Sequence, residues 1–473
     1  MKQITFSKTE TDILEKVQKA ATALDMEAYI IGGFVRDKIL ERPNKDIDIV
    51  CTGDSIELAR FTAAQFKIAP NVHYFKNFGT AQIKMGSMEI EFVTARKESY
   101  RRDSRKPEVT PGTITDDQNR RDFTINALAI DVRSYGEAEV IDPFRGQEDL
   151  QQKLIRTPLD PHRTFDDDPL RMMRAVRFAA QLDFRLDESC IAAIRELRER
   201  IAIVSKERVA DELHKIMLTP VPSKGLYLLD KCGLLELLLP QLCDLKGSQT
   251  FDNIGHKDNF IHSLQVLDNI SGQTDQLWLR YAALFHDIGK ARVKKFEEGT
   301  GWTFHGHEFV SGKLLPKIFA HLKFPTQDKL PYVRKIVELH HRPISLTKDD
   351  ITDSAIRRLL FDAGDQLEDL MTLCEADITS KNEARKKRYL NNFRLVRQRL
   401  AEVEEKDKIR NWQPPVSGEV IMDTFGIAPG QLVGRIKDAI REAILEGEIG
   451  NNYEEAFAYM LEKGKELNLE PKD

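Results

Sequence analysis

The stretch Ala28–Cys51 constrains the fold of this chain more than any other part of it. It reads A-Y-I-I-G-G-F-V-R-D-K-I-L-E-R-P-N-K-D-I-D-I-V-C. The apolar run Ala28–Ile31 predicts a buried strand, and after two glycines Phe34–Leu40 has the apolar spacing of a helix. Beyond a turn, Lys45–Cys51 alternates as a second strand would. This order of elements predicts a sheet that carries a ligand site beside the glycines.

The pair Gly32 and Gly33 lets a ligand approach the backbone closely, because glycine has no Cβ atom. The helix behind the pair would direct unpaired N–H groups and the positive end of its dipole at that ligand, which suits a phosphate. Arg36, in the first turn of this helix, would add a fork of donors for phosphate oxygens. For a glycine pair considered alone, an ordinary turn is the alternative.

Asp46 and Asp48 lie two positions apart on the second predicted strand, so their carboxylates leave the same face of the sheet. Neighbouring carboxylates repel each other unless a divalent cation lies between them. Hard oxygen ligands of this kind suit Mg²⁺ that is shared with the phosphates of a nucleotide. A polar face on an edge strand is the alternative, but the ordered set of strand, glycine pair, Arg-Asp and D-x-D favours a catalytic site.

The motif G-G-F-V-R-D followed by D-I-D resembles the signature of the class II branch of the nucleotidyltransferase superfamily. That branch contains the CCA-adding tRNA nucleotidyltransferases and the bacterial poly(A) polymerases. The resemblance implies an α+β chain with a small mixed-sheet nucleotidyltransferase head, followed by an extended all-α neck, an HD domain and a tail.

The segment E-F-V-T-A-R is similar to the third acidic strand of that family. The similarity identifies Glu91 as a third catalytic carboxylate. It would complete a two-metal site or act as the base toward the 3′-hydroxyl that attacks the α-phosphate. A solvent-facing glutamate on an edge strand is the alternative.

Composition bounds the class of protein. The 473 residues suggest about three domains at roughly 150 residues each. No apolar run approaches the ~18 residues of a membrane span, and the charged N-terminus lacks a signal-peptide core. The five cysteines are scattered and form no C-x-x-C pair, so a cytoplasmic location is expected. Because the net charge is −5, a nucleic-acid partner must be bound by local basic clusters.

Two segments follow the predicted sheet. Lys97–Asn119 is polar and broken by prolines and a glycine, which predicts a mobile loop. In the family, a flexible loop at this place adapts the site to successive nucleotides. The next segment, R-R-D-F-T-I-N-A-L, predicts a helix face shared by Arg121, Asp122 and Asn126. It resembles the family motif that reads the sugar hydroxyls, which implies that these residues bind the ribose and a phosphate.

A basic ridge is predicted on the helix that begins near Pro169. Arg171, Arg174 and Arg177 recur on it every three residues, and Asp168 lies three residues before the first of them. A carboxylate and a guanidinium side by side can bind a base along its Watson–Crick edge. C and A both present an amine beside a ring acceptor. Side chains would thus act as the template, and Arg174 and Arg177 would help to receive the triphosphate.

The same stretch resembles the E-D-x-x-R template motif of the family, with one departure. Asp167 stands where the family usually has Glu, so the first acidic position carries less weight than Asp168. A helix N-cap followed by a solvated arginine face is the alternative. The segment Ser205–Met217 resembles the next family motif, in which the Glu207-Arg208 pair would stabilise the helical support behind the base site.

Most of the eleven histidines lie in a second constellation after residue 250. They are ordered as H, then H-D, then H, H and D, which resembles the HD phosphohydrolase superfamily. The residues assigned to a first metal are His262, His286, Asp287 and Asp377, and those assigned to a second are His307 and His340. Such ligands suit Mg²⁺ or a divalent transition metal, which can activate water against a phosphoester. Some class II enzymes have this activity, whereas in others the domain is only a helical scaffold.

Lys381–Leu400 has the pattern of an amphipathic helix with one strongly basic face. Lys386, Lys387 and Arg388 form the densest part of that face. A basic helix of this kind suits an RNA backbone. A solvated surface is the alternative.

The patterns predict four segments: a nucleotidyltransferase head (1–150), a helical neck with the base-selecting motif (151–250), an HD phosphohydrolase-like domain (251–380) and a helical tRNA-binding tail (381–473). The expected activity is template-independent addition of CCA to the 3′ end of tRNA from CTP and ATP, with Mg²⁺ and an additional HD phosphohydrolase activity. Alternatives are a poly(A) polymerase or an A- or CC-adding enzyme of the same family. From a different class, the alternative is chiefly an HD phosphohydrolase with a nucleotide-binding head.

Overall fold

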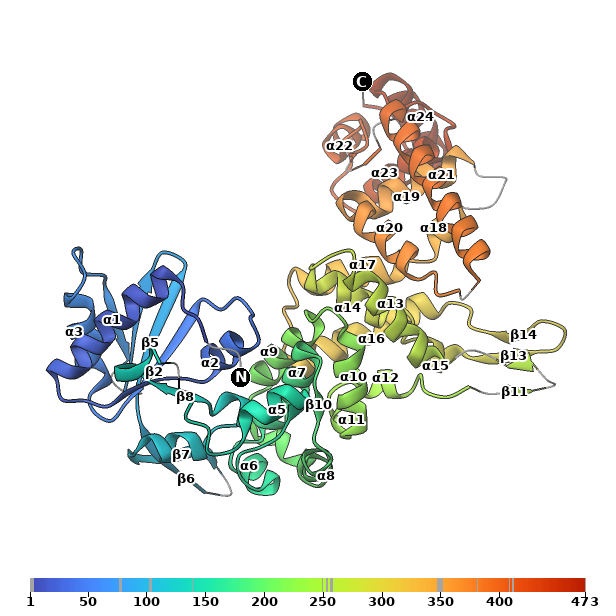
Figure 1. Ribbon diagram of the computed structural model, residues 1–473. Coiled ribbons are helices and arrows are strands. Elements are labelled where there is room, and N and C mark those ends of the chain that lie inside the picture. Colours follow the sequence, from blue (N-terminus) through green and yellow to red (C-terminus); the bar gives the residue numbers. More distant parts are fainter. Residues whose placement is uncertain are drawn as a thin grey trace. The chain divides into compact units, whose positions relative to one another are not determined.

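The structure is a computed structural model. It describes residues 4–75, 79–101, 104–137, 139–248, 250–251, 254–255, 258–346, 352–380, 382–407, 409–410 and 412–472. The chain divides into two compact units, Met1–Leu238 and Leu239–Asp473 (Figure 1). The boundaries at residues 150, 250 and 380 divide the chain more finely and stay predictions.

A six-stranded mixed sheet forms the core of the N-terminal part. Its strands lie in the order β3 (Val72–Phe75), β4 (Thr80–Met85), β5 (Met88–Thr94), β2 (Asp46–Cys51), β1 (Ala28–Ile31) and β8 (Ala129–Asp131). The apolar strand β1 is buried along its whole length, as its sequence predicts. It pairs antiparallel with β2, and β2 pairs parallel with β5. The two strands predicted to carry carboxylates are therefore direct neighbours.

The alternation of β2 separates a packed face from a polar one. Ile47 and Ile49 have no exposed surface, whereas Asp46 is exposed and Asp48 is half-buried. Helix α1 (Lys8–Ala23) packs against α3 (Ser55–Ala64), and α3 packs on β4 and β5. The short helix α2 (Gly33–Ile39) follows β1 directly.

Two local predictions for the head are wrong. Lys97–Asn119 was expected to be a loop. The structure has instead an antiparallel pair, β6 (Arg96–Arg101) and β7 (Ser104–Pro111), followed by α4 (Ile114–Asn119). Prolines are tolerated there because both strands of an isolated pair are edges. The helix expected at Arg121–Asn126 is replaced by a turn and a 3₁₀ segment, Thr124–Asn126.

Helices follow the sheet in the first unit. They are α5 (Gly146–Gln152), α6 (Pro161–Asp167), α7 (Leu170–Leu182), α8 (Glu188–Leu197), α9 (Lys206–Met217), α10 (Pro222–Lys231) and α11 (Leu234–Leu238). A two-residue parallel pair, β9 (Leu154–Ile155) and β10 (Arg185–Leu186), lies among them. Helix α7 packs against α9 and α10.

The second unit is largely helical. Its helices are α12 (Pro240–Cys243), α13 (Asn259–Ser271), α14 (Leu277–Phe285), α15 (Lys290–Val293), α16 (His307–Leu322), α17 (Lys329–Leu339), α18 (Arg342–Ser345), α19 (Asp353–Ala363), α20 (Leu367–Ala376), α21 (Glu383–Asp407), α22 (Gly418–Phe425), α23 (Gln431–Glu446) and α24 (Tyr453–Glu466). Two short pairs complete it: β11 (Thr250–Phe251) with β12 (Ile254–Gly255), and β13 (Lys295–Glu297) with β14 (Gly301–Thr303). The predicted mixed-sheet head with a largely helical remainder is confirmed.

The central helix of the second unit is α14. Its residues Leu279–Phe285 are all buried, the charged Arg280 among them, as expected for a helix that is apolar on most of its sides. Helices α13, α17 and α20 pack around it, and α16 packs against α17. In the part of the chain that the structure describes, no helix combines the length and apolar character needed to cross a membrane.

Candidate active sites

The first site is built on the neighbouring strands β2 and β5. Their register places Asp48 beside Glu91 and Asp46 beside Glu89. The three predicted carboxylates therefore lie on adjacent strands. Their oxygens are not within 4.8 Å of one another, in contrast to the ligand atoms of the two histidine-containing groups described below.

Asp48 is the least favourably placed of these carboxylates. Its pKa is raised to about 6, chiefly by burial and also by the charges of Glu91 and Asp46, while Arg121 opposes the shift. A half-buried carboxylate beside two others is costly when ionised. A divalent cation would remove that cost, so the residues fit the Mg²⁺ predicted from the sequence.

The two glycines that follow β1, Gly32 and Gly33, differ in how strongly the backbone requires glycine. Gly32 has a φ of +79°, and a Cβ there would lie 2.7 Å from Nη1 of Arg121. A Cβ at Gly33 would meet Nη2 of Arg36 at 3.6 Å and Nδ2 of Asn44 at 4.0 Å, and both are ordinary contacts. Only Gly32 therefore requires glycine for the fold itself.

We expect Gly32→Ala to lower the free energy of unfolding by about 1–3 kcal/mol, because it combines a left-handed backbone with a steric clash. Gly33→Ala is the matched control and should leave stability near that of the wild type. Urea denaturation followed by circular dichroism measures both. Equal losses in the two variants would contradict this account of Gly32.

The sequence suggests that Arg36 offers a free fork of donors to phosphate, but in the structure its donors are already in use. Its Nε and Nη2 donate to Asp37 at 2.9 Å, and its Nη1 donates to Oδ1 of Asn126 at 2.7 Å. The side chain is buried, yet it lines the larger of two cavities at this site. A role in nucleotide binding stays a prediction, and Arg36 would act through charge and through the residues that it holds.

A continuous chain of hydrogen bonds joins the start of β2 to helix α7, with links of 2.7–3.0 Å. Its members in order are Asp46, Asn44, Asp37, Arg36, Asn126, Asp122 and Arg174. Asp122 lies near the α7 end and is buried. Burial opposes its charge, but Arg174 and Asn126 outweigh that effect and lower the pKa of Asp122 to about 2. Asp122 is therefore ionised and rigidly held.

Phe178 organises the arginines around this chain. The guanidinium groups of Arg177, Arg36 and Arg174 lie 4.0, 5.1 and 5.3 Å from the centre of its ring. Cations stack favourably on an aromatic face. Arg177 also pairs with Glu212 at 2.8 Å. Burial lowers the pKa of Arg177 to about 10, which leaves it charged at neutral pH.

The predicted base-selecting residues lie at the start of helix α7: Asp168 precedes it and Arg171 is in its first turn. Oδ1 of Asp168 accepts from the backbone N–H of Leu170 at 3.1 Å, although the N-cap of α7 is Pro169. Arg171 is buried and donates to the carbonyl oxygens of Arg120, at 2.5 Å, and Thr164, at 3.4 Å. Each side chain is thus fixed by the backbone rather than by the other.

Two cavities meet at the first site. The larger, of about 880 Å³, is lined by Gly33, Arg36, Asp46, Asn126 and Arg177 among others. The smaller, of about 330 Å³, is lined by Asp168, Arg171 and Arg208 among others. Both are bordered by Asp48, Glu91, Arg121, Asp122 and Arg174. The predicted metal, ribose and base residues therefore surround one continuous region.

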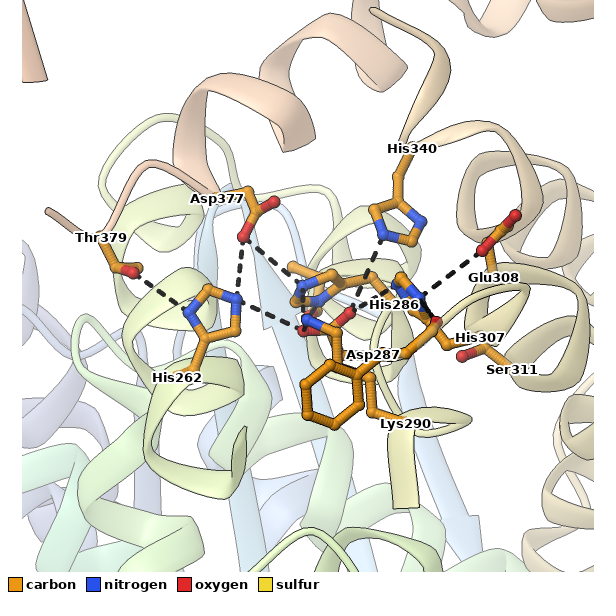
Figure 2. Close-up of polar contacts among 12 residues, drawn as sticks. His262, His286, Asp287, Lys290, His307, Glu308, Ser311, His340, Asp377 and Thr379 are labelled. Atoms are coloured by element: carbon orange, nitrogen blue, oxygen red, sulfur yellow. Dashed lines mark hydrogen bonds and ion pairs between the residues drawn. The ribbon is translucent and has the colours of Figure 1, made fainter. Parts of the chain in front are cut away.

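The second site centres on Asp287, which directly follows His286 at the end of α14 (Figure 2). Its Oδ2 lies 3.3 Å from Nε2 of His286 and 3.4 Å from Nε2 of His262. Its Oδ1 lies 3.1 Å from Nε2 of His307. Oδ1 of Asp377 lies 2.9 Å from Nε2 of His262. The set predicted for a first metal is therefore brought together.

Three of the histidines are oriented in the same way. Nδ1 of His286, His307 and His340 lies 2.6–2.8 Å from the carbonyl oxygen three residues earlier in the chain. This bond fixes the tautomer and turns the Nε2 lone pair inward. The three Nε2 atoms and Oδ1 of Asp287 are buried and have no hydrogen bond of acceptable geometry among the described residues.

Two metal positions fit these unsatisfied atoms. The ligand atoms of His262, His286 and Asp287 lie within 4.8 Å of one another, as do those of a second group, His307, His340 and His341. Buried polar atoms without partners are costly, and a divalent ion would satisfy them. His341, the neighbour of His340 in E-L-H-H-R-P, was not assigned to a metal from the sequence.

Family models match three segments of the chain. Residues 28–156 match the poly A polymerase head domain, residues 183–246 the probable RNA and SrmB-binding site of polymerase A, and residues 259–382 the HD domain. The A-adding tRNA nucleotidyltransferase of Deinococcus radiodurans is 32% identical over 444 residues, which cover 90% of this chain and 93% of that protein. The chain belongs to the class II tRNA nucleotidyltransferase family.

Two further comparisons agree with this membership. The CCA-adding enzyme of Streptococcus sanguinis is 28% identical over 95% of this chain and 96% of that protein. A solved tRNA nucleotidyltransferase, complexed with a primer tRNA and an incoming ATP analogue, matches with a TM-score of 0.55 and 25% identity over 81% of this chain and 98% of that one.

For this tRNA nucleotidyltransferase, the predicted family is confirmed, and the roles of single residues stay predictions.

Reasoning from the sequence missed Asp37, Asn44 and Phe178, which hold other site residues in place. A signal existed for Asp37, which directly follows Arg36 in G-G-F-V-R-D. Arg208 was placed behind the base site, yet it lines the smaller cavity. Lys387 and Arg388 are exposed on α21, where RNA binding stays a prediction, as it does for Lys386.

Proposed function

We propose that this tRNA nucleotidyltransferase adds CCA to the 3′ end of tRNA from CTP and ATP. The proposal rests on one observation: the predicted metal-binding carboxylates and the predicted base-selecting residues line two adjoining cavities of the first site. The carboxylates of β2 and β5 and the base-selecting residues of α7 line cavities that share five residues. A nucleotide with its triphosphate near Asp46 and Asp48 would reach Asp168 with its base.

The proposed reaction is a direct nucleotidyl transfer. Asp46 and Asp48 would hold Mg²⁺, which supplies charge stabilisation for the triphosphate when bound. The 3′ oxygen of tRNA forms a bond to the α-phosphorus, and the bond from that phosphorus to the bridging oxygen of the β-phosphate breaks. Glu91 takes the proton of the 3′-hydroxyl, and pyrophosphate leaves. Arg174 and Arg177 stabilise the developing negative charge, while Arg121, Asp122 and Asn126 position the ribose.

The base would be read by Asp168 and Arg171. The carboxylate accepts from the exocyclic amine of C or A, and the guanidinium donates to the neighbouring ring acceptor. In the same position, U and G would place a carbonyl oxygen against the carboxylate and a ring N–H against the guanidinium, so both contacts would be mismatched. A buried charge without a partner is costly, which turns this mismatch into selectivity.

We expect Asp168→Asn to lower the preference for CTP over UTP by about tenfold or more, since an amide both donates and accepts. The fold should persist, because the amide oxygen of Asn can accept from the same backbone N–H of Leu170. Single-nucleotide incorporation with each triphosphate measures the preference. Asp160→Asn, which alters the N-cap of the neighbouring helix α6, is the matched control and should keep the wild-type preference. An unchanged preference in Asp168→Asn would contradict base reading by this residue.

The activity is tested with two tRNA transcripts, one that lacks the whole CCA end and one that lacks only the final A. Sequencing of the 3′ ends after incubation with CTP and ATP should show CCA on both. Runs of A with CTP ignored would identify a poly(A) polymerase instead.

A-addition is the second candidate, because an A-adding enzyme is the relative that is 32% identical over 90% of the chain. It predicts extension of the transcript that ends in CC and no extension of the other. Addition of CC alone would identify the remaining member of the family.

The second site supports a further proposed activity, metal-dependent hydrolysis of a phosphoester. The observation behind it is the set of buried, inward-facing Nε2 atoms and Asp287 Oδ1, which have no well-aligned hydrogen bond among the described residues. A metal bound there would supply a polarised water. In hydrolysis of a phosphomonoester, the water oxygen bonds to phosphorus, the ester bond breaks, and the alcohol leaves with a proton.

A further inference from the structure

Asp117 is a buried carboxylate beside the first site. It lies on the short helix α4, has no exposed surface, and is not among the described lining residues of either cavity. The adjacent Gln118 is also buried, and its Nε2 donates to the carbonyl oxygen of Ala127 at 2.7 Å. Ala127 directly follows Asn126, one of the predicted ribose residues. This bond fixes the position of Asp117 relative to the site.

The two oxygens of the Asp117 carboxylate accept from different arginines. Oδ1 accepts from Nε of Arg120 at 2.9 Å and also from its Nη2. Oδ2 accepts from Nε of Arg121 at 3.0 Å. Burial opposes the charge of Asp117, but Arg121 and Arg120 outweigh that effect and hold the pKa of this carboxyl below its usual range. An ionised carboxylate therefore holds both arginines.

Arg121 is bound to Asp117 along one edge of its guanidinium. Arg120 occupies Oδ1, and Arg121 reaches Oδ2 through its Nε. Its Nη1 is directed elsewhere: it donates to the carbonyl oxygen of Asn126 at 3.4 Å and lies beside Gly32. Because a guanidinium is planar and rigid, fixing its Nε side sets the direction of its Nη side. That side serves the two cavities, both of which Arg121 lines.

Stability alone does not explain this arrangement. The cost of taking charges out of water offsets most of the attraction within a buried ion pair, so such pairs add little net stability. What they do provide is a defined geometry, because a buried donor or acceptor that loses its partner is costly. Here the geometry directs Arg121 at the region where the two cavities meet.

We infer that Asp117 is a positioning residue for nucleotide addition, which directs the guanidinium of Arg121 at the bound nucleotide. The inference rests on the proposed function and extends it to a residue outside both cavities. Asp117 belongs to Lys97–Asn119, which the sequence predicts to be a loop, so the pattern assigned no role to it.

The test measures the dissociation constant of CTP on full-length protein by isothermal titration calorimetry, with Mg²⁺ and without tRNA. Asp117→Asn should raise this constant about tenfold, because a misdirected Arg121 loses a charged hydrogen bond to the nucleotide. Arg121→Ala should raise it by at least as much. Asp116→Asn is the matched control, since this neighbouring carboxylate of α4 bonds to Thr113 instead. The control should bind CTP as the wild type does.

A double variant separates positioning from a general loss of structure. If Asp117 acts through Arg121, Asp117→Asn should cause no further loss of affinity in the Arg121→Ala background. A merely structural role would weaken binding by the same factor in both backgrounds, which would overturn the inference.

Arg121→Lys decides the question if Asp117→Asn does not fold. It keeps the charge, but a lysine ammonium is a single point charge that cannot serve Asp117 and the nucleotide at the same time. The dissociation constant of CTP should therefore rise as it does in Arg121→Ala. Binding of CTP as tight as in the wild type would contradict the inference.

Each failure has its own signature. If the wild type binds no CTP, the proposed function itself is overturned, and this inference falls with it. If Arg121→Ala weakens binding and a folded Asp117→Asn does not, the inference alone is overturned. Wild-type binding in Arg121→Ala, or an equal loss in Asp116→Asn, would also overturn it.

Discussion

Asp48→Asn should reduce nucleotide addition to tRNA by at least about 10³-fold while the protein stays folded. The side chain is close in size to the original, but it cannot neutralise a metal ion as a carboxylate does. Asp48 lies beside Glu91 in the register of β2 and β5 and borders both cavities of the first site. Incorporation of labelled CTP and ATP into truncated tRNA measures the loss.

The same variant should not lose thermal stability in metal-free buffer. The pKa of Asp48 is raised to about 6 from the ordinary 3.8. The ionised carboxylate therefore opposes folding, increasingly as the pH rises from about 4 to 6 and fully above that range. Asn carries no charge, so at pH 7 we expect a midpoint of thermal unfolding that is equal to or above that of the wild type.

Asp131→Asn is the matched control for Asp48→Asn. Asp131 lies on β8 of the same sheet and pairs only with the nearby Arg133 among the described residues. The Asp131→Asn variant should keep the full rate of nucleotide addition to tRNA. An active Asp48→Asn enzyme, or an inactive one that has also unfolded, would contradict the metal-holding role.

Asp287→Asn should abolish metal binding and phosphoester hydrolysis at the second site. Three histidine Nε2 atoms and Nζ of Lys290 lie within 3.4 Å of the Asp287 carboxylate. An amide cannot neutralise a bound cation, so we expect hydrolysis to fall by at least about 100-fold. Metal content is measured by mass spectrometry after dialysis, and hydrolysis by phosphate release.

Addition of nucleotides to tRNA should be unchanged in Asp287→Asn, because the first site belongs to the other compact unit. Asp328→Asn, an exposed position before α17, controls for loss of a negative charge and should keep both activities. Loss of tRNA addition in Asp287→Asn would show that the two sites are not independent. Retention of metal and hydrolysis would remove Asp287 from the centre of the second site.

The elements that local sequence patterns determine could be predicted. The apolar run before Gly32 and the alternation that carries Asp46 and Asp48 identify β1 and β2 without tertiary information. The ordered histidines and aspartates identify the second site, because each lies at the end of a helix with a clear apolar pattern. Arg171 and its two successors recur every three residues, which identifies the ridge of α7.

The features that depend on contacts between distant segments could not be predicted. Arg36 was expected to be free, but Asn126, ninety residues later, accepts one of its donors. Phe178 gives no local sign that three guanidinium groups gather on it. The pair β6 and β7 was missed because prolines normally argue against strands. In a two-stranded pair both strands are edges that tolerate proline, and the register of this pair shifts between Ser99 and Arg101.

The most direct test of the account is a crystal structure of the protein with Mg²⁺ and a non-hydrolysable CTP analogue. The account predicts the metal between Asp46 and Asp48, the triphosphate beside Gly33, and the cytosine amine within hydrogen-bond distance of Asp168. A cytosine bound away from α7, or a metal held by other residues, would contradict it.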